Sequence, residues 1–155
     1  MDNENNAQQP AIMIRSQYIK DMSIEVPLAP TIFKEINNQP QVHVDLGVKN
    51  ELQDDGSYVV TLNTKMDADI NDKKLFIVEL SYCANLDLNV PEDQKEPVLM
   101  IELPRLMFPF VRSIISSSLI AAGLPPLMLN PIDFVAMYQA RKAQEEAKQK
   151  EKKEK

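Results

Sequence analysis

The chain has one cysteine, one histidine and no tryptophan among its 155 residues. Because Cys83 has no second cysteine to pair with, an internal disulfide is excluded and a reducing compartment is favoured; we expect a small buried side chain there. His43 has no second histidine and no cysteine cluster beside it, which argues against a zinc site of ordinary composition. No serine stands in a nucleophile-elbow context, which argues against a hydrolase built on His43.

The sequence also lacks a long apolar run. No stretch reaches the roughly 18–20 apolar residues that span a bilayer. Residues 1–9 are acidic and rich in amides, whereas a signal peptide begins with positive charge and continues with an apolar segment. We therefore expect a cytoplasmic protein without direct membrane insertion.

Positive charge is scarce outside the last residues of the chain. Residues 141–155 hold seven Lys or Arg and four Glu, a local charge of +3. Because the whole chain has a formal net charge of −6, residues 1–140 carry a net charge of −9. Because binding to a phosphate backbone needs a net basic face, the acidic body argues against a nucleic-acid partner.

The residues that are present favour one folded domain. A chain of 155 residues is too short to divide between two cores that would each offset the conformational entropy of folding. Residues 1–11 have little to bury and predict a disordered N-terminal tail. We expect the folded domain to span residues 12–140, and the Lys/Glu-rich residues 141–155 to form a charged, largely disordered C-terminal tail.

Four segments alternate apolar and polar residues with the period of two that is typical of strands. They lie at residues 22–26, 42–48, 58–62 and 75–82. Turn signals at Asp54-Asp55-Gly56 and at Asn71-Asp72 separate the last three segments. These short connections favour an antiparallel meander.

The second half of the chain predicts helices. Residues 91–97, with two prolines and several charges, are expected to form a loop. Pro109 suits the first turn of a long helix over residues 110–122, and Asn130 is expected to cap a last helix with Pro131 at its first position. The predicted fold class is α+β: an antiparallel sheet followed by a long helix and a C-terminal helix.

Three segments stand out by their sequence: residues 103–112, residues 123–134 and residues 18–27. They resemble the SecB family of bacterial export chaperones. Their order and spacing match the family from about residue 12 to residue 139. The resemblance implies a four-stranded antiparallel sheet with two helices, assembled as a dimer of dimers (a homotetramer), with no cofactor, no metal and no catalytic residues.

Members of that family hold unfolded precursor proteins in long apolar grooves and pass them to SecA, the export ATPase. The resemblance places the precursor-binding groove at Phe33, Ile36, Phe134, Met137 and Tyr138. Asn37-Asn38 stand where the family often has a tryptophan, so we expect a less aromatic groove. Methionines suit such a groove because their flexible side chains repack against different partners, although each could equally fill a core.

The resemblance also places SecA-binding residues on two strands, at Asp21, Glu25, Ile77 and Glu79. Alternation puts Asp21 on the same face as Glu25, and Ile77 on the same face as Glu79. An ordinary solvated strand face would show the same pattern. Periodicity does not determine whether the two pairs adjoin, and that expectation rests on the resemblance.

An excess of apolar residues on a small sheet and helix predicts assembly. The expected oligomer interface contains Val78, Leu80, Tyr82, Ile114 and Leu119. By the resemblance the three strand residues lie at or near the contact between dimers, so Val78→Arg is expected to yield dimers. Serines at positions 113 and 116–118 form a solvated stripe or let a partner helix approach closely.

Two other functions are compatible with the sequence. A SecB-like chaperone could serve one dedicated client, such as the antitoxin of a toxin–antitoxin system, but the acidic set Asp21, Glu25 and Glu79 favours export. An enzyme or small-ligand carrier would need convergent polar groups in a cavity, and the sequence shows none. We therefore expect a non-enzymatic export chaperone.

Overall fold

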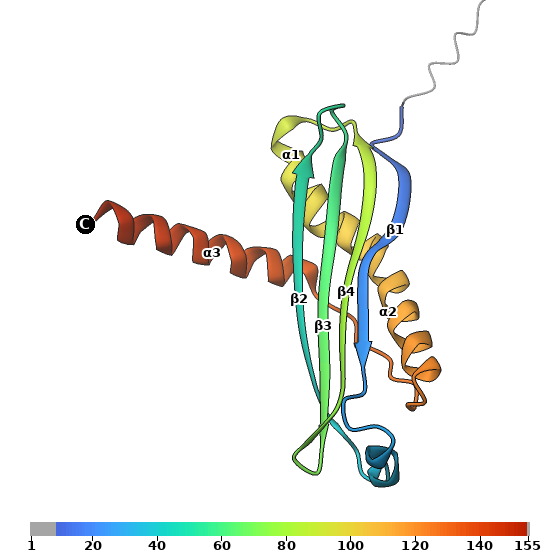
Figure 1. Ribbon diagram of the computed structural model, residues 1–155. Helices are drawn as coiled ribbons and strands as arrows, with labels where there is room; N and C mark the ends of the chain where they lie inside the picture. The colour runs from blue at the N-terminus through green and yellow to red at the C-terminus, as the bar shows by residue number, and fades with distance from the viewer. Residues whose placement is uncertain (1–8, 155) are drawn as a thin grey trace, which may run out of the picture.

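The computed structural model describes residues 9–154 (Figure 1). The predicted N-terminal tail, residues 1–11, lies outside the described residues except for its last three. The elements are β1 (Ile12–Glu25), the 3-10 turn η1 (Thr31–Glu35), β2 (Gln41–Leu52), β3 (Tyr58–Ile70), β4 (Lys73–Leu88), α1 (Glu92–Pro97), the π-helical turn η2 (Val98–Glu102), α2 (Leu103–Ala121) and α3 (Phe134–Lys153).

The four strands form one antiparallel sheet in the order β1-β4-β3-β2. In Figure 1, α2 lies behind this sheet, and α3 leaves the edge formed by β2 and projects away from it. The sheet therefore has an inner face toward α2 and an outer face on the opposite side, with β1 and β2 as its two open edges. The predicted fold class is confirmed.

The strands are longer than the apolar alternation predicts. In β3 the inward alternation continues through Met66, Ala68 and Ile70, all buried, but it is interrupted by Thr64, a buried polar residue. In β1, register shifts between Ile14 and Ser16 and between Ile19 and Asp21 break the period of two. A bulge reverses which side chains face inward, so pattern counting stops at it.

The two predicted hairpin turns are present. Gly56 has a φ of +83°, which favours glycine, at the turn between β2 and β3. Asn71 and Asp72 have φ values of 50° and 59°, and they form the two-residue turn between β3 and β4. Positive φ at both central residues matches the right-handed twist of the strands that the turn joins.

The helical half starts earlier than predicted. Residues 91–97 contain α1 instead of a loop, and α1 continues through η2 into α2. Pro109 consequently lies inside α2 and not in its first turn. A proline inside a helix removes one backbone hydrogen bond, but α2 offsets this loss by burying one face against the sheet. That face carries Leu103, Met107, Val111, Ile115 and Leu119.

The last helix differs from its prediction at both ends. It begins at Phe134, and its N-cap is Asp133, whose carboxylate accepts a hydrogen bond from the backbone N–H of Ala136 at 3.0 Å, in place of Asn130. It then runs to Lys153, through the segment expected to be largely disordered. Lys, Glu, Gln and Ala all favour helix, and this composition explains the difference.

Four of the five residues expected at the oligomer interface are buried within one chain, which corrects that assignment. Val78 and Leu119 are 0% exposed, Leu80 and Tyr82 are 2% and 6% exposed, and only Ile114 is half-buried. Alternation indicates the inner face, but it does not distinguish cover by the chain's own α2 from cover by a second copy. These four side chains offer no surface that another copy could contact directly.

The exposed side of α2 carries three large apolar residues instead. Leu106, Phe110 and Ile120 are 49%, 50% and 57% exposed. Cys83, by contrast, is buried as predicted. Among the described residues, no helix combines the length and the apolar character needed to cross a membrane.

Candidate functional site

The outer face of the sheet brings the two pairs of predicted SecA-binding residues together. In the antiparallel register of β1 and β4, Glu25 lies opposite Ile77, and Ser23 lies opposite Glu79. Asp21 lies two residues before Ser23 on β1, opposite Ser81. The four predicted SecA-binding residues therefore form one contiguous patch, which we call the acidic patch (Asp21, Glu25, Ile77 and Glu79).

The acidic patch is only weakly neutralised. Within residues 9–154, Asp21 and Glu25 form no ion pair, and Glu79 has a single lysine, Lys65, at 3.8 Å between the amine nitrogen and the carboxylate oxygen. Both side chains of that pair are more than half exposed, so the pair contributes little. The patch thus presents free carboxylates around the half-buried, apolar Ile77.

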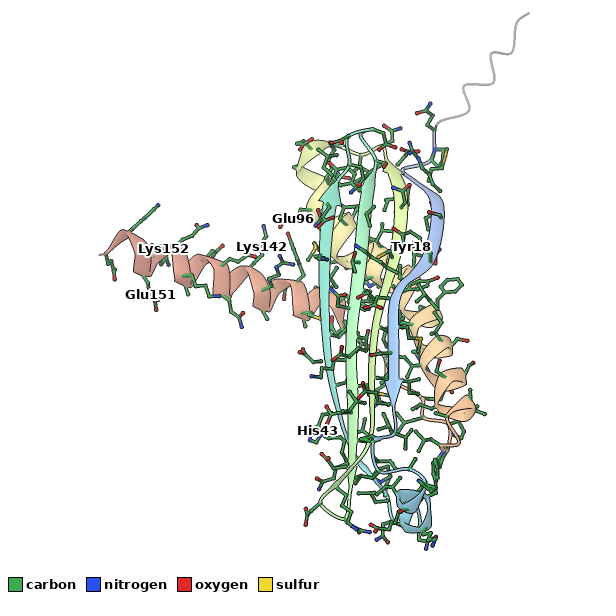
Figure 2. All side chains as sticks on the ribbon, in the orientation of Figure 1. Tyr18, His43, Glu96, Lys142, Glu151 and Lys152 are labelled. Carbon is green, nitrogen blue, oxygen red and sulfur yellow. The ribbon has the colours of Figure 1, made fainter. Side chains whose placement is uncertain are left out.

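A second group of carboxylates on the outer face already shares a lysine. The amine nitrogen of Lys74 lies 2.6 Å from an oxygen of Asp67 and 2.9 Å from one of Asp69. The hydrogen bond from Lys74 lowers the pKa of Asp67 below its ordinary value. His43, on β2 in Figure 2, and the two aspartates bring possible metal-ligand atoms within 4.8 Å of one another. Because Lys74 already contacts both carboxylates, this cluster is an ion-pair network.

One predicted groove residue, Ile36, lines a cavity beside β2. The cavity has a volume of about 470 Å³ and is bounded by the loop at residues 36–40, Val42, the start of β4 and residues 124–127. Asn37-Asn38 form part of its wall, so it lacks an aromatic side chain at that point. Phe33, 37% exposed, does not line this cavity. Its ring packs beside Gly123, where an added Cβ atom would lie 3.5 Å from the Cζ atom of Phe33.

Two other predicted groove residues line a second cavity. Met137 and Tyr138 of α3 face β2 across a space of about 450 Å³. Residues 45–48 and Met100 complete the wall on the other side. Two flexible methionine side chains therefore border this cavity, a composition that can adapt to different side chains.

Phe134 does not belong to the groove, which corrects its assignment. It is 2% exposed, and its ring packs edge-on against Phe108 with the ring centroids 5.8 Å apart. As the first residue after the N-cap of α3, it faces inward and fixes the start of the helix on the core. Phe134 therefore supports Met137 and Tyr138 and is not accessible to a client.

The open edge of β2 joins the two cavities, and sequence reasoning missed it. Arg141 of α3 donates a hydrogen bond from Nη1 to the backbone carbonyl of Val48 at 2.9 Å. That carbonyl points away from β3, so the even-numbered residues of β2 direct their N–H and C=O groups to the open edge. Val42 borders the first cavity and Val48 the second, about 20 Å apart along the strand.

Comparison with known proteins identifies the family. The model of the family described as "Preprotein translocase subunit SecB" matches residues 5–145. A "Protein-export protein SecB" from Paramagnetospirillum magneticum is 46% identical over 143 residues, which are 90% of this chain and 91% of the relative. Another, from Rhodospirillum rubrum, is 44% identical over 135 residues, 87% of this chain and 84% of the relative. The chain belongs to the SecB family.

A solved structure shares the SecB fold. A SecB-like chaperone from Mycobacterium tuberculosis, solved in complex with a peptide from an antitoxin, superposes with a TM-score of 0.66. It is 14% identical in sequence and covers 79% of this chain and 91% of its own. At this identity the likeness supports the SecB fold alone.

The structure thus divides the residues predicted from the SecB resemblance. It brings together the acidic patch, and it places Ile36, Met137 and Tyr138 on cavities along the β2 edge. Phe134 and four of the five predicted interface residues are instead buried in the core. The sequence predicts a disordered tail at Arg141, and its contact with β2 follows only from the length of α3.

Proposed function

We propose that this SecB-family chain is an export chaperone that holds unfolded precursor proteins and delivers them to the SecA ATPase. The observation that carries the proposal is the open edge of β2 with a cavity at each end whose wall is partly apolar, which we call the β2 track. An unfolded segment offers the two things that this track can bind. These are free backbone hydrogen-bonding groups and scattered apolar side chains.

The chemistry of the β2 track suits many sequences. An extended segment that pairs with β2 makes backbone hydrogen bonds, which do not depend on side-chain identity. Apolar side chains of that segment would enter the cavities beside Ile36 and Met137, and each covered side chain contributes about 1–3 kcal/mol. Affinity without sequence specificity is what a chaperone for many precursors needs.

The acidic patch is the proposed docking site for SecA. Unpaired carboxylates at Asp21 and Glu25 attract a basic surface, and Ile77, opposite Glu25, offers an apolar contact. The patch lies on the outer face of the sheet, whereas the β2 track lies at its edge beside α3. A client and the motor can therefore occupy the molecule at the same time.

Assembly into a dimer of dimers in the cytoplasm completes the proposal. Leu106, Phe110 and Ile120 on the exposed side of α2 are the contact that a second copy would cover, with small serines at positions 113 and 117 between them. Small residues let two helices approach closely. This exposed side of α2 replaces the buried strand residues as the proposed interface.

Export is favoured over service to one dedicated client. The export relatives are 46% and 44% identical over most of the chain, whereas the structure with an antitoxin peptide is 14% identical. A pull-down with the full chain as bait is expected to recover many unfolded precursors. Recovery of one small protein alone would favour the dedicated-client function.

A holding assay without ATP tests the proposal directly. Near-stoichiometric protein is expected to keep a slow-folding precursor from aggregating. Met137→Glu places a charge in the wall of the β2 track and is expected to raise the protein concentration needed for half protection several-fold. Ala136→Glu, on the exposed side of the same helix, is the matched control and should behave like the unchanged protein. Equal protection by both variants, or protection by catalytic amounts, would contradict the proposed function.

A further inference from the structure

The far end of α3 is a basic segment that packs against no other element within residues 9–154. Residues 146–153, which we call the distal segment, contain four lysines, two glutamates, one alanine and one glutamine. All their side chains are exposed. In Figure 2, Lys152 and Glu151 lie near the tip of α3, far from the sheet.

The basic residues of α3 fall into two groups. Close to the sheet, Arg141 lies 3.0 Å from Glu145, and Lys142 lies 3.3 Å from Glu96 of α1. The distal segment contains Lys148, Lys150, Lys152 and Lys153. Within residues 9–154, none of these four lysines forms an ion pair. The Arg141 hydrogen bond to Val48 and the Lys142–Glu96 pair hold α3 on the body, whereas the second group remains available to a partner.

Distance separates the distal lysines from the acidic body. Residues 1–140 carry a formal charge of −9, which would repel an anionic partner at short range. From Arg141 at the β2 edge to Lys153, α3 rises about 18 Å. Salt screens charges over about 8 Å at physiological ionic strength. The tip of α3 therefore presents its own positive potential.

The side chains of the distal segment restrict the class of partner. The segment has no aromatic residue to stack on a base and no arginine to grip a phosphate with two hydrogen bonds. It has no large apolar residue that could enter a bilayer core. Lysine is a compact, strongly hydrated charge that is attracted to a diffuse anionic surface, and membranes with anionic lipids are such surfaces.

We propose that the distal segment adsorbs to anionic phospholipid headgroups, without insertion, and so holds the chaperone at the membrane surface. The inference rests on the proposed export function, because precursors must reach a membrane to be exported. Several copies in one assembly would multiply a weak contact through their high effective concentration. An acidic protein surface is the competing partner that the experiment must distinguish.

Sedimentation of the full chain with lipid vesicles tests the proposal. One set of vesicles contains phosphatidylcholine alone, and the other adds phosphatidylglycerol. We expect binding only to the anionic set, decreasing as salt rises. Replacing three distal lysines (Lys150→Gln, Lys152→Gln, Lys153→Gln) should weaken that binding by at least about tenfold. Glutamine preserves helix propensity, so α3 is retained.

The matched control removes the same charge from the body. Lys20→Gln, Lys34→Gln and Lys49→Gln change three exposed lysines outside α3, and binding is expected to remain within about twofold. Equal loss with this control, no loss with the distal variant, or capture of the chain by soluble poly-glutamate but not by vesicles would each overturn the proposal. The holding assay, run on the same samples, separates this result from a failure of the chaperone function.

Discussion

The two faces of the four-stranded sheet are made by the same strands but differ in the surroundings of their side chains. On the inner face, Val78 and Leu80 of β4 are almost completely buried under α2. On the outer face, their sequence neighbours Ile77 and Glu79 meet charged side chains that remain partly in water. Stability therefore depends on the inner face, whereas the outer face is free to recognise a partner.

The sharpest test of this difference places the same charge on each face. Val78→Arg buries an unpaired guanidinium in the core and is expected to lower the free energy of unfolding by more than about 3 kcal/mol. Ile77→Arg, one residue away, puts the charge beside Glu25 and Asp67 and should stay within about 0.5 kcal/mol. Urea unfolding followed by circular dichroism measures both values.

The outcome also decides how β4 affects assembly. The SecB resemblance predicts that Val78→Arg yields dimers, but the complete burial of Val78 within one chain predicts loss of folding instead. A folded Val78→Arg dimer, found by light scattering, would contradict the assignment of this residue to the core. Equal destabilisation by Ile77→Arg would contradict the division of the sheet into two faces.

The next prediction concerns recognition by the outer face. Reversing the charge of the acidic patch with Asp21→Lys and Glu25→Lys is expected to weaken SecA binding by at least about tenfold, because two unpaired carboxylates are replaced by cations. Stability and precursor holding should change little, since both side chains are exposed. Biolayer interferometry with immobilised SecA measures the change.

Asp45 provides the matched control for this prediction. It is exposed on the same face, two strands away from β4 on β2, and Asp45→Lys makes the same change of charge. SecA binding by this single variant should remain close to that of the unchanged protein. If Asp45→Lys weakens binding as much as Asp21→Lys alone, the outer face attracts SecA by net charge and the patch has no special role.

How far the sequence predicts this structure differs between the two faces. Alternation identifies which side chains of β4 point inward, because the period of a strand is fixed at two. It does not identify what covers them, and so it cannot distinguish α2 from a second copy as the cover of Val78. Strand ends were missed for a related reason: bulges near Ser16 and Asp21 shift the alternation without any signal in residue type.

The candidate site shows the same limit. That Glu25 and Ile77 adjoin depends on the β1–β4 register, which pairs residues far apart in the sequence, such as Ile12 with Leu88. The β2 track depends on where α3 crosses the edge, and the Arg141 hydrogen bond to Val48 follows from a helix expected to be shorter. Local patterns predict local structure, whereas these contacts arise from tertiary packing.

The smallest predicted effect is a difference in acid sensitivity between the two faces. In the exposed turn between β2 and β3, hydrogen bonds from Ser57 and from Arg15 lower the pKa of Asp55 to about 2, from an ordinary value of 3.8. Because the pKa of Asp55 is lower in the folded state than in the unfolded state, its ionised carboxylate stabilises the fold, and this stabilisation is complete above about pH 4. It is lost as the pH falls toward 2. The buried aliphatic residues of the inner face have no comparable dependence.

Urea midpoints measured between pH 6 and pH 2 test this difference. Asp55→Asn removes the titrating group and should flatten the fall in stability below pH 4, whereas Asp54→Asn, in the same turn, should leave the slope unchanged. The Asp55 carboxylate holds Arg15 at 2.7 Å and thereby ties β1 to the turn between β2 and β3. Indistinguishable slopes for Asp55→Asn and the unchanged protein would mean that this tie contributes nothing to folding. The stability of the sheet would then rest on its inner face alone.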